Sequence, residues 1–218
     1  MNENWHQQLK NKHRDDLISA GKELFLNDGL FQMKIKDVCA KAKLSRVTFY
    51  KHFQSMDDLL LSIHMELIEH LTNHVSRAAA EMEFMNGYEQ LAAMLNAWIT
   101  FARNYPDHIR FIQLFDINYE SYDFNQELKE RYHLFTQNGK ERHFLLGALS
   151  RGTVDGSIRS NLPPLHLAQF IFTAMMGMLQ KSVSSCSNIL NASDTQMPEQ
   201  FVSMLLQYVY GERTSEES

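Results

Sequence analysis

KAKLSRVTFYKHF, residues 41–53, is the stretch of sequence that decides the fold of this chain. The apolar residues Ile35, Val38 and Cys39 predict a short helix that ends near the start of this stretch. After a tight turn, Ser45 can begin a second short helix, because its hydroxyl accepts a hydrogen bond from a backbone N–H that lacks a partner within the helix. Two short helices joined by a turn of about three or four residues form a helix-turn-helix.

The second short helix, expected to run to about residue 52, has an apolar and a polar side. Its polar side consists of Ser45, Arg46, Thr48, Tyr50, Lys51 and His52. Arg46 and Lys51 can bind phosphates or guanine edges, and Thr48 can contact a base. Tyr50 and His52 can reach phosphates. On spacing alone, a surface helix with mixed polar residues is an equally good interpretation.

The rest of the chain is expected to be helical. Only four prolines and nine glycines interrupt 218 residues, which favours long helices over many short strands. Leu17, Leu24 and Phe25 fall at helical spacing and predict a first helix, which Gly29 can end in the left-handed conformation. Ser55 and Asp58 have the spacing of a capping box, which predicts the start of a fourth helix. Helical spacing of apolar residues predicts further helices over 88–104, from 106, and over 128–149, 165–185 and 198–211. The expected class is all-α with about nine helices, a three-helix head preceding a helical bundle.

The formal charge is divided unevenly along the chain. The net charge is −5, but residues 1–56 carry +4 and the remainder carries −9. A basic head on an acidic body can bind phosphates while the body repels DNA. Because surface charges also scatter by chance, charge alone does not decide between a nucleic-acid-binding protein and another soluble one.

The N-terminal residues resemble the signature of the TetR (tetracycline-repressor) family. The resemblance lies in Leu24-Phe25 and Gly29, in residues 37–40 (DVCA), in 44–53 (LSRVTFYKHF) and in 58–60 (DLL), and it spans roughly residues 14–63. It implies a helix-turn-helix DNA-binding domain over residues 1–56 and an effector-binding and dimerisation domain over 57–218. It also implies three partners: a double-stranded DNA operator, a second copy of the chain and an unidentified small-molecule effector.

Four residues depart from the family pattern. Lys43 stands where the family usually has a glycine in the turn, a position that often needs a positive φ. Val47 replaces a glycine on the recognition helix. Lys34 and Met56 stand where a phosphate-binding threonine and lysine are usual, and the charges of Lys34 and Lys43 can compensate. We therefore add Lys34 and Lys43 to the expected DNA contacts.

An effector pocket is expected among aromatic side chains of the body. Trp98, Phe101, Phe111 and Phe115 lie on two helices that are adjacent in sequence. Most such residues must be core, but a helical bundle rich in aromatic and methionine side chains can also hold a small apolar ligand. The family resemblance implies such a ligand, so we predict that some of these rings line its pocket.

A dimer interface is expected on the last two helices. Phe170, Ala174, Gly177 and Lys181 fall three or four residues apart, and small side chains at two of them let another backbone approach. The final helix carries an apolar stripe of Val202, Leu205, Leu206 and Val209. Paired with their symmetry copies, these helices would form a four-helix bundle. The alternative is that both stripes face only their own domain.

Metal and cofactor sites are not expected. Glu66, His70 and His74 recur at a spacing of four residues, but a solvated helix face is the preferred interpretation. Glu130 and His133 match half of a di-iron motif that has no second copy in the sequence. The cysteines, Cys39 and Cys186, are expected to be buried thiols, with redox sensing as the alternative.

Catalysis and membrane insertion are also not expected. The sequence has no phosphate-binding glycine loop, no nucleophile elbow and no paired catalytic carboxylates. No apolar run is long enough to span a membrane, and residues 1–5 do not resemble a signal peptide, so we expect a cytoplasmic protein. We expect a dimeric, ligand-responsive repressor. The alternative is an all-α small-molecule-binding protein or enzyme that binds no DNA.

Overall fold

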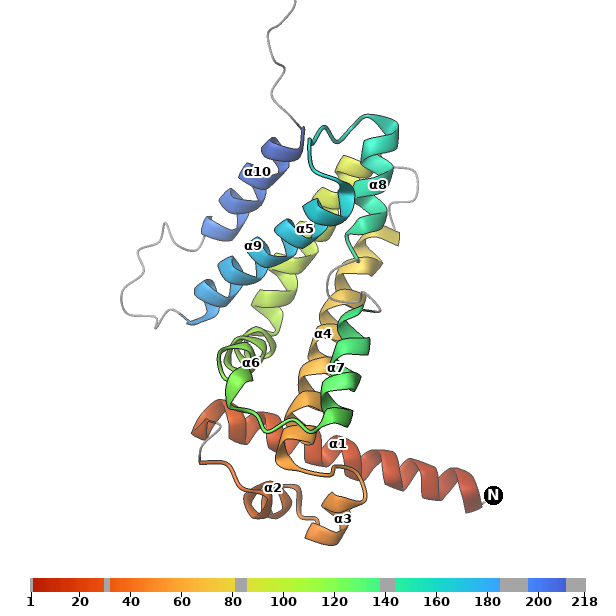
Figure 1. The fold of residues 1–218 in the computed structure, drawn as a ribbon, viewed down its shortest axis with the longest axis vertical. Coiled ribbons are helices and arrows are strands. Elements are labelled where there is room, and N and C mark those ends of the chain that lie inside the picture. The colour runs from red at the N-terminus through yellow and green to blue at the C-terminus, as the bar shows by residue number, and fades with distance from the viewer. Residues whose placement is uncertain (1, 30–31, 81–85, 138–143, 185–195, 211–218) are drawn as a thin grey trace, which may run out of the picture. The chain divides into compact units, whose positions relative to one another are not determined.

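The computed structural model describes residues 2–29, 32–80, 86–137, 144–184 and 196–210. Within these ranges the chain forms ten α-helices, one short 3₁₀ helix and no strand, so the all-α class is confirmed (Figure 1). The helices are α1 (Asn2–Asp28), α2 (Ile35–Ala42), α3 (Arg46–Tyr50), α4 (Met56–Ala80), α5 (Gly87–Asn104), α6 (Pro106–Ile117), η1 (Tyr119–Ser121), α7 (Gln126–Gln137), α8 (Leu146–Asp155), α9 (Pro164–Ser184) and α10 (Met197–Tyr210).

The expectation of one helix over residues 128–149 was wrong. The chain forms two helices there, α7 and α8, which brings the described total to ten rather than nine. Residues 138–143 between them lie outside the described ranges.

The chain divides into two compact units. Unit 1 comprises Met1–Leu67 and Arg110–Leu134, and unit 2 comprises Ile68–Ile109 and Phe135–Ser218. Unit 1 therefore contains the helix-turn-helix candidate together with the first turns of α4 and most of α6 and α7. The functional boundary predicted after residue 56 remains a prediction.

Unit 1 is built on the apolar side of α1. Leu17 and Phe25 of α1 are buried, and the Phe25 ring lies 4.7 Å from that of Phe111. Gly21 lies where α1 meets α4, because a Cβ at this position would come within 2.8 Å of the Leu59 side chain. A larger residue at Gly21 would require the Leu59 side chain to shift. Helices α2 and α3 pack against the same helix α1.

Unit 2 is a bundle in which α5 contacts α8, α9 and α10. The approach of α5 to α8 is closest at two glycines, since a Cβ on Gly87 would lie 2.1 Å from the backbone nitrogen of Gly152. The Gly87 N–H donates to Asp155 at 2.9 Å, which joins the start of α5 to the end of α8. Among the described helices of both units, none is long and apolar enough to cross a membrane.

Candidate nucleic-acid interface

The turn between α2 and α3 has the conformation that the sequence predicted. Lys43 adopts φ 56° and ψ 38°, the left-handed region. Its N–H donates to Ala40 O at 3.2 Å, and the N–H of Leu44 donates to Cys39 O at 2.9 Å. This pair of bonds is a Schellman motif, which usually places glycine where Lys43 stands. A lysine here costs about 1 kcal/mol relative to glycine, so the chain keeps a positive charge at this corner at a conformational cost.

Ser45 caps α3 as expected. Its Oγ accepts the backbone N–H of Thr48 at 3.0 Å and lies 2.9 Å from the Thr48 hydroxyl. The α-helix ends at Tyr50, earlier than predicted, and continues as a turn in which His52 N–H donates to Phe49 O at 2.9 Å. Phe49 and Phe53 hold this segment in place, because both rings are buried and lie 5.7 Å apart.

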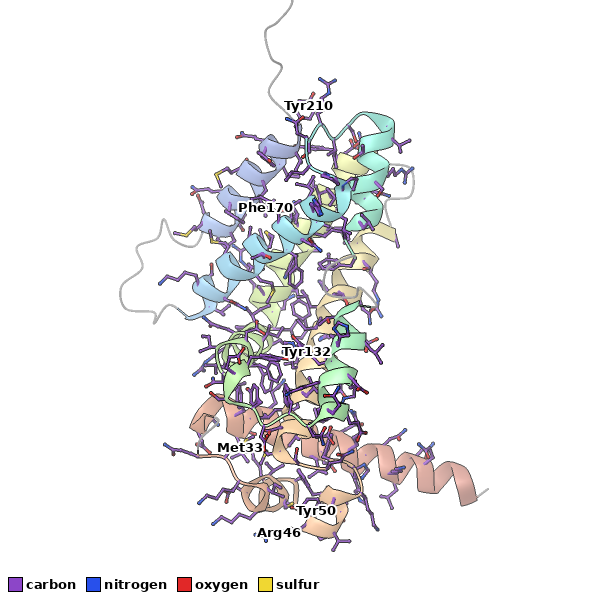
Figure 2. All side chains as sticks on the ribbon, in the orientation of Figure 1. Met33, Arg46, Tyr50, Tyr132, Phe170 and Tyr210 are labelled. Carbon is purple, nitrogen blue, oxygen red and sulfur yellow. The ribbon has the colours of Figure 1, made fainter. Side chains whose placement is uncertain are left out.

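The predicted DNA contacts lie on the exposed side of these helices. Six of them are exposed: Lys34, Lys43, Ser45, Arg46, Tyr50 and Lys51. Thr48 and His52 are half-buried. Arg46 and Tyr50 mark the outer side of α3 in Figure 2. The structure thus brings the predicted contacts to one region of unit 1, and their role in binding remains a prediction.

Val47 is an exposed residue that the predicted contact set omitted. Val47 is the second residue of α3, and its apolar side chain is 68% exposed. An exposed β-branched side chain on a recognition helix suits contact with a thymine methyl group. The sequence signal for Val47 is its replacement of the glycine that is usual at this position of the signature.

The imidazole of His52 lies in a strongly basic environment. Burial lowers its pKa below the ordinary value. Nearby positive groups lower it further: Lys10, His13, Arg14 and Lys51. Three of these groups come from α1, so the end of α3 and the N-terminal half of α1 share one basic surface.

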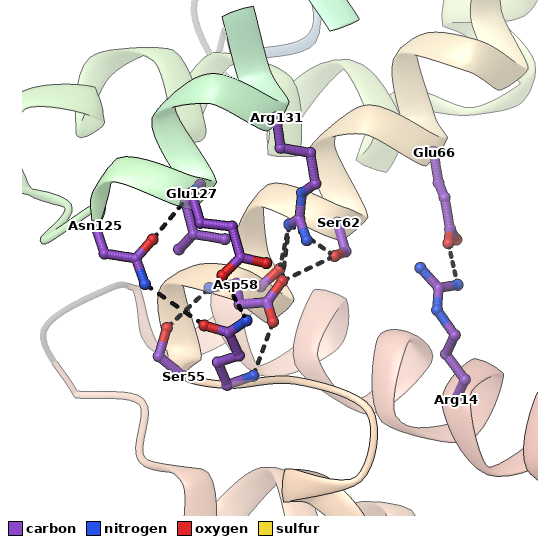
Figure 3. Close-up of polar contacts among 10 residues, drawn as sticks. Arg14, Ser55, Asp58, Ser62, Glu66, Asn125, Glu127 and Arg131 are labelled. Carbon is purple, nitrogen blue, oxygen red and sulfur yellow. Dashed lines mark hydrogen bonds and ion pairs between the residues drawn. The ribbon is translucent and has the colours of Figure 1, made fainter. Parts of the chain in front are cut away.

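An ion pair between Arg131 and the buried carboxylate of Asp58 stabilises the connection between α3 and α4 (Figure 3). Asp58 is 4% exposed and accepts Arg131 Nη2 at 2.7 Å and the Gln54 N–H at 2.8 Å. The Asp58 N–H donates to Ser55 Oγ at 3.1 Å, so the predicted cap of α4 is present. In a complete capping box the Asp58 side chain would accept the N–H of Ser55. Here it accepts the N–H of Gln54, one residue earlier. Arg131 was not predicted from the sequence. It lies between Glu130 and His133, which match half of a di-iron motif.

The candidate metal ligands have other roles. Glu66 forms an ion pair with Arg14, whose guanidinium carbon also lies 5.7 Å from the centre of the Phe53 ring. In unit 2, His70 and His74 pack on Phe101, with ring centroids 5.1 and 5.4 Å away. Across the described residues, no group of three or more His, Cys, Asp and Glu side chains is arranged to hold a metal ion.

Of the two cysteines, Cys39 lies within the described residues. Cys39 is a free, buried thiol on α2, and its burial raises its pKa while the charge of Arg46 opposes the shift. A thiol of this kind is a weak nucleophile. Cys186 lies outside the described residues.

The four aromatic residues predicted for an effector pocket are all fully buried, but they belong to different units. In unit 2, Trp98 packs on Phe144 and Phe172, at 5.3 and 5.5 Å between ring centroids, and Phe101 lies one helical turn further along α5. Phe111 and Phe115 belong to unit 1, where Phe115 stacks on His64 at 4.1 Å. Whether any of these rings lines a pocket remains a prediction.

The residues predicted for the dimer interface differ in their exposure to solvent. On α9, Phe170 is 50% exposed, and a Cβ added to Gly177 would meet nothing within 4 Å. Lys181 is also exposed, and Ala174 and Leu206 are half-buried. The remaining three, Val202, Leu205 and Val209, are at most 4% exposed in the single chain, and their place in a dimer interface stays a prediction. The exposed side of α10 carries Met204 and Tyr208 instead, and the Tyr208 ring lies 6.2 Å from that of Phe170.

Comparison with known proteins agrees with this geometry. Residues 17–63 match the family described as bacterial regulatory proteins, tetR family. No curated protein sequence matches the chain.

Solved structures share the fold over nearly the whole chain. A TetR family transcription regulator from Marinobacter aquaeolei VT8 has a TM-score of 0.66 at 16% identity, over 93% of this chain and 98% of its own. The regulator FadR from Bacillus subtilis, solved in complex with stearoyl-CoA, has a TM-score of 0.66 at 18% identity, over 89% and 98%. A TetR-family regulator from Syntrophomonas wolfei has a TM-score of 0.69 at 14% identity, over 94% and 99%. Similarity at these identities shows the fold of the chain.

Proposed function

From the premise that this chain is a DNA-binding transcription regulator of the TetR family, we propose that it is a repressor released by a small apolar effector. In this proposal a homodimer binds a near-palindromic operator, and effector binding favours a conformation that no longer fits both half-sites. Acting on DNA, it would work in the cytoplasm.

The observation that carries the proposal is the exposed side of α3. Arg46 and Val47 are exposed there, beside the capped N-terminus at Ser45, so they can reach base edges when α3 lies in a major groove. Tyr50 and Lys51 follow at the other end of the helix and are suited to phosphates. Lys34 and Lys43, both exposed, flank the helix on the α2 side and add two cations.

Two heads are needed because each offers few phosphate contacts. Binding through phosphates weakens steeply with salt, so a single head would not hold its site at physiological ionic strength. The exposed pair of Phe170 and Tyr208, beside the open surface of Gly177, supports a dimer through α9 and α10. Exposed aromatic side chains next to a small residue are suited to a close helix–helix contact between protomers.

An apolar effector is proposed from the buried aromatic residues and from one relative. The structure of FadR from Bacillus subtilis contains stearoyl-CoA, a ligand with a long acyl chain. In this chain, Trp98 and Phe101 in unit 2 and Phe115 in unit 1 are buried aromatic side chains of the kind that line apolar pockets. We propose that the effector binds beside the buried aromatic side chains of one of these two units.

The test is a binding titration on duplex DNA. Duplexes are first selected from random sequence by the purified protein, and affinity is then measured from 50 to 200 mM salt. A regulator loses affinity by orders of magnitude over such a range and prefers the selected site. Arg46→Ala should abolish this preference, whereas Lys129→Ala, which removes one exposed charge on α7, should not. Failure to select any sequence, together with no binding at low salt, would instead support the small-molecule-binding protein or enzyme.

A further inference from the structure

Helix α1 is much longer than the part of it that packs into unit 1. It spans 27 residues, or about 40 Å at 1.5 Å per residue. Leu17 is the first of its described side chains to be buried. In Figure 1 the N-terminal end of α1 projects beyond the other helices of unit 1. This half of the helix is therefore available to contact something outside the unit.

One face of this exposed half is basic. At about 100° per residue, Lys10, His13 and Arg14 fall on the same side as the buried Leu17. The carboxylates of Asp15 and Asp16 and the side chain of Lys12 fall on other sides of the helix. Although this part of α1 contains both acidic and basic residues, Lys10, His13 and Arg14 form a basic strip along one of its faces.

The position of this strip is fixed by contacts with α3 and α4. The Arg14 guanidinium lies 5.7 Å over the ring of Phe53 and pairs with Glu66. The Phe53 ring in turn lies 6.3 Å from the imidazole of His52. The strip therefore adjoins the end of α3, where the proposed phosphate contacts Lys51 and His52 lie.

Two lysines of this surface have no acidic partner in the described part of the chain. Arg14 has Glu66 as a partner, but Lys10 and Lys51 form no ion pair with the described carboxylates. Burial lowers the pKa of His52, and repulsion between its charged form and the surrounding basic groups lowers it further. A polyanion would reduce that repulsion, because each phosphate can pair with a cation that has no anionic partner in the protein's described residues.

We propose that Lys10 and His13 of α1 bind backbone phosphates of the operator outside the groove that α3 enters. Each head then covers a longer stretch of duplex than its helix-turn-helix alone. The inference rests on the proposed function, since it assigns a second contact to the same DNA. Duplex DNA is favoured over an acidic protein because the strip continues the surface of Lys51 and His52 beside the recognition helix.

Two duplexes and two matched variants test the proposal. One duplex carries only the selected site, and the other adds about half a helical turn, about 5 bp, on each side. Lys10→Ala removes a lysine from the basic strip, and Lys12→Ala removes one from the far side of the same helix. Because alanine favours helix, both variants should keep α1 intact, which circular dichroism checks.

The wild type should bind the longer duplex several-fold more tightly than the short one. Lys10→Ala should lose this gain and lower the salt slope on the longer duplex by about one, while Lys12→Ala behaves as wild type. An equal affinity of the wild type for both duplexes, or equal behaviour of the two variants, overturns the inference and leaves the proposed function intact. Absence of binding to either duplex overturns the proposed function itself.

Discussion

Arg131 of α7 donates to Asp58 in the first turn of α4 at 2.7 Å, although the two residues are 73 positions apart. Asp58 is buried, and the same carboxylate accepts the backbone N–H of Gln54 in the connection from α3. Arg131 also approaches Ser62 Oγ at 3.3 Å. One ion pair thus joins α7 to the segment that positions the recognition helix.

Removing this arginine should destabilise the protein. Arg131→Met leaves the buried Asp58 carboxylate without its cation, and we expect a loss of about 1–3 kcal/mol in the free energy of unfolding. The value is below that of a fully enclosed pair because the arginine side chain is 38% exposed. Urea denaturation should show a lower midpoint with an unchanged slope. Lys129→Met, an exposed change on the same helix, should alter stability little, and equal effects of the two variants would contradict the assignment.

Base recognition by α3 should depend on Thr48. Its hydroxyl lies 2.9 Å from Ser45 Oγ, which orients it beside the capped end of the helix. Thr48→Ala should relax sequence preference at one or two positions, at about 1–3 kcal/mol. Tyr50→Phe and His52→Ala should weaken binding to all duplexes alike. Competition between the selected site and random DNA separates the two patterns, and a uniform loss for Thr48→Ala would remove this residue from base recognition.

DNA affinity should rise as pH falls from about 7.5 to about 5.5. Burial and neighbouring cations lower the pKa of His52 in the free protein, so its imidazole is largely neutral at pH 7. A bound phosphate favours the charged form, so the complex takes up protons and binding strengthens through this window. His52→Gln should flatten the dependence between pH 5.5 and about 7.5, and His166→Gln, an exposed histidine on α9, should not. A profile that His52→Gln leaves unchanged would count against this role.

The free protein should respond to pH in the opposite direction. Because the pKa of His52 is lowered by folding, the unfolded chain binds the proton more readily. Above the pKa of His52 in the unfolded chain, about 6.5, the charge state of His52 therefore does not change the free energy of unfolding. As pH falls toward the pKa in the folded protein, His52 lowers the free energy of unfolding. Urea midpoints of the wild type and His52→Gln should accordingly converge at pH 8 and diverge near pH 5.5.

Dimerisation should fail when a bulky charge is placed on α9. Nothing lies within 4 Å of a Cβ at Gly177, so Gly177→Arg should be accommodated by the protomer. The same is true of Gly147 on α8, which makes Gly147→Arg a matched control. Sedimentation should show monomers and lost operator binding for Gly177→Arg only. A Gly177→Arg dimer with normal operator affinity would place the interface on another face.

Effector binding should stabilise the protein against heat. Stearoyl-CoA is the first probe, because it occupies one structural relative. A ligand at a hundred times its Kd raises the free energy of unfolding by about 2.7 kcal/mol and shifts Tm accordingly. Phe101→Leu tests unit 2 and Phe115→Leu tests unit 1, and the variant that loses the shift locates the pocket. If neither stearoyl-CoA nor a panel of other apolar molecules shifts Tm, the effector proposal is contradicted.

The sequence by itself determined the features that depend on neighbouring residues. The positive φ of Lys43, the cap by Ser45 and the left-handed stop at Gly29 each follow from a few adjacent residues. Such features are local because a turn or a cap is fixed by hydrogen bonds between residues at most five positions apart. The all-α class followed in the same way from helical spacing repeated along the chain.

Only the tertiary structure decided which helix faces are buried and which distant charges meet. An apolar stripe on α10 has the same pattern whether it packs on its own unit or on a second copy, so spacing did not reveal that Val202 and Val209 are buried in the single chain. Nor does the sequence indicate that Arg131 pairs with Asp58, or that Lys10 lies near His52. These relationships depend on how α1, α4 and α7 pack together, and packing is set by the summed shape and burial of residues from many parts of the chain.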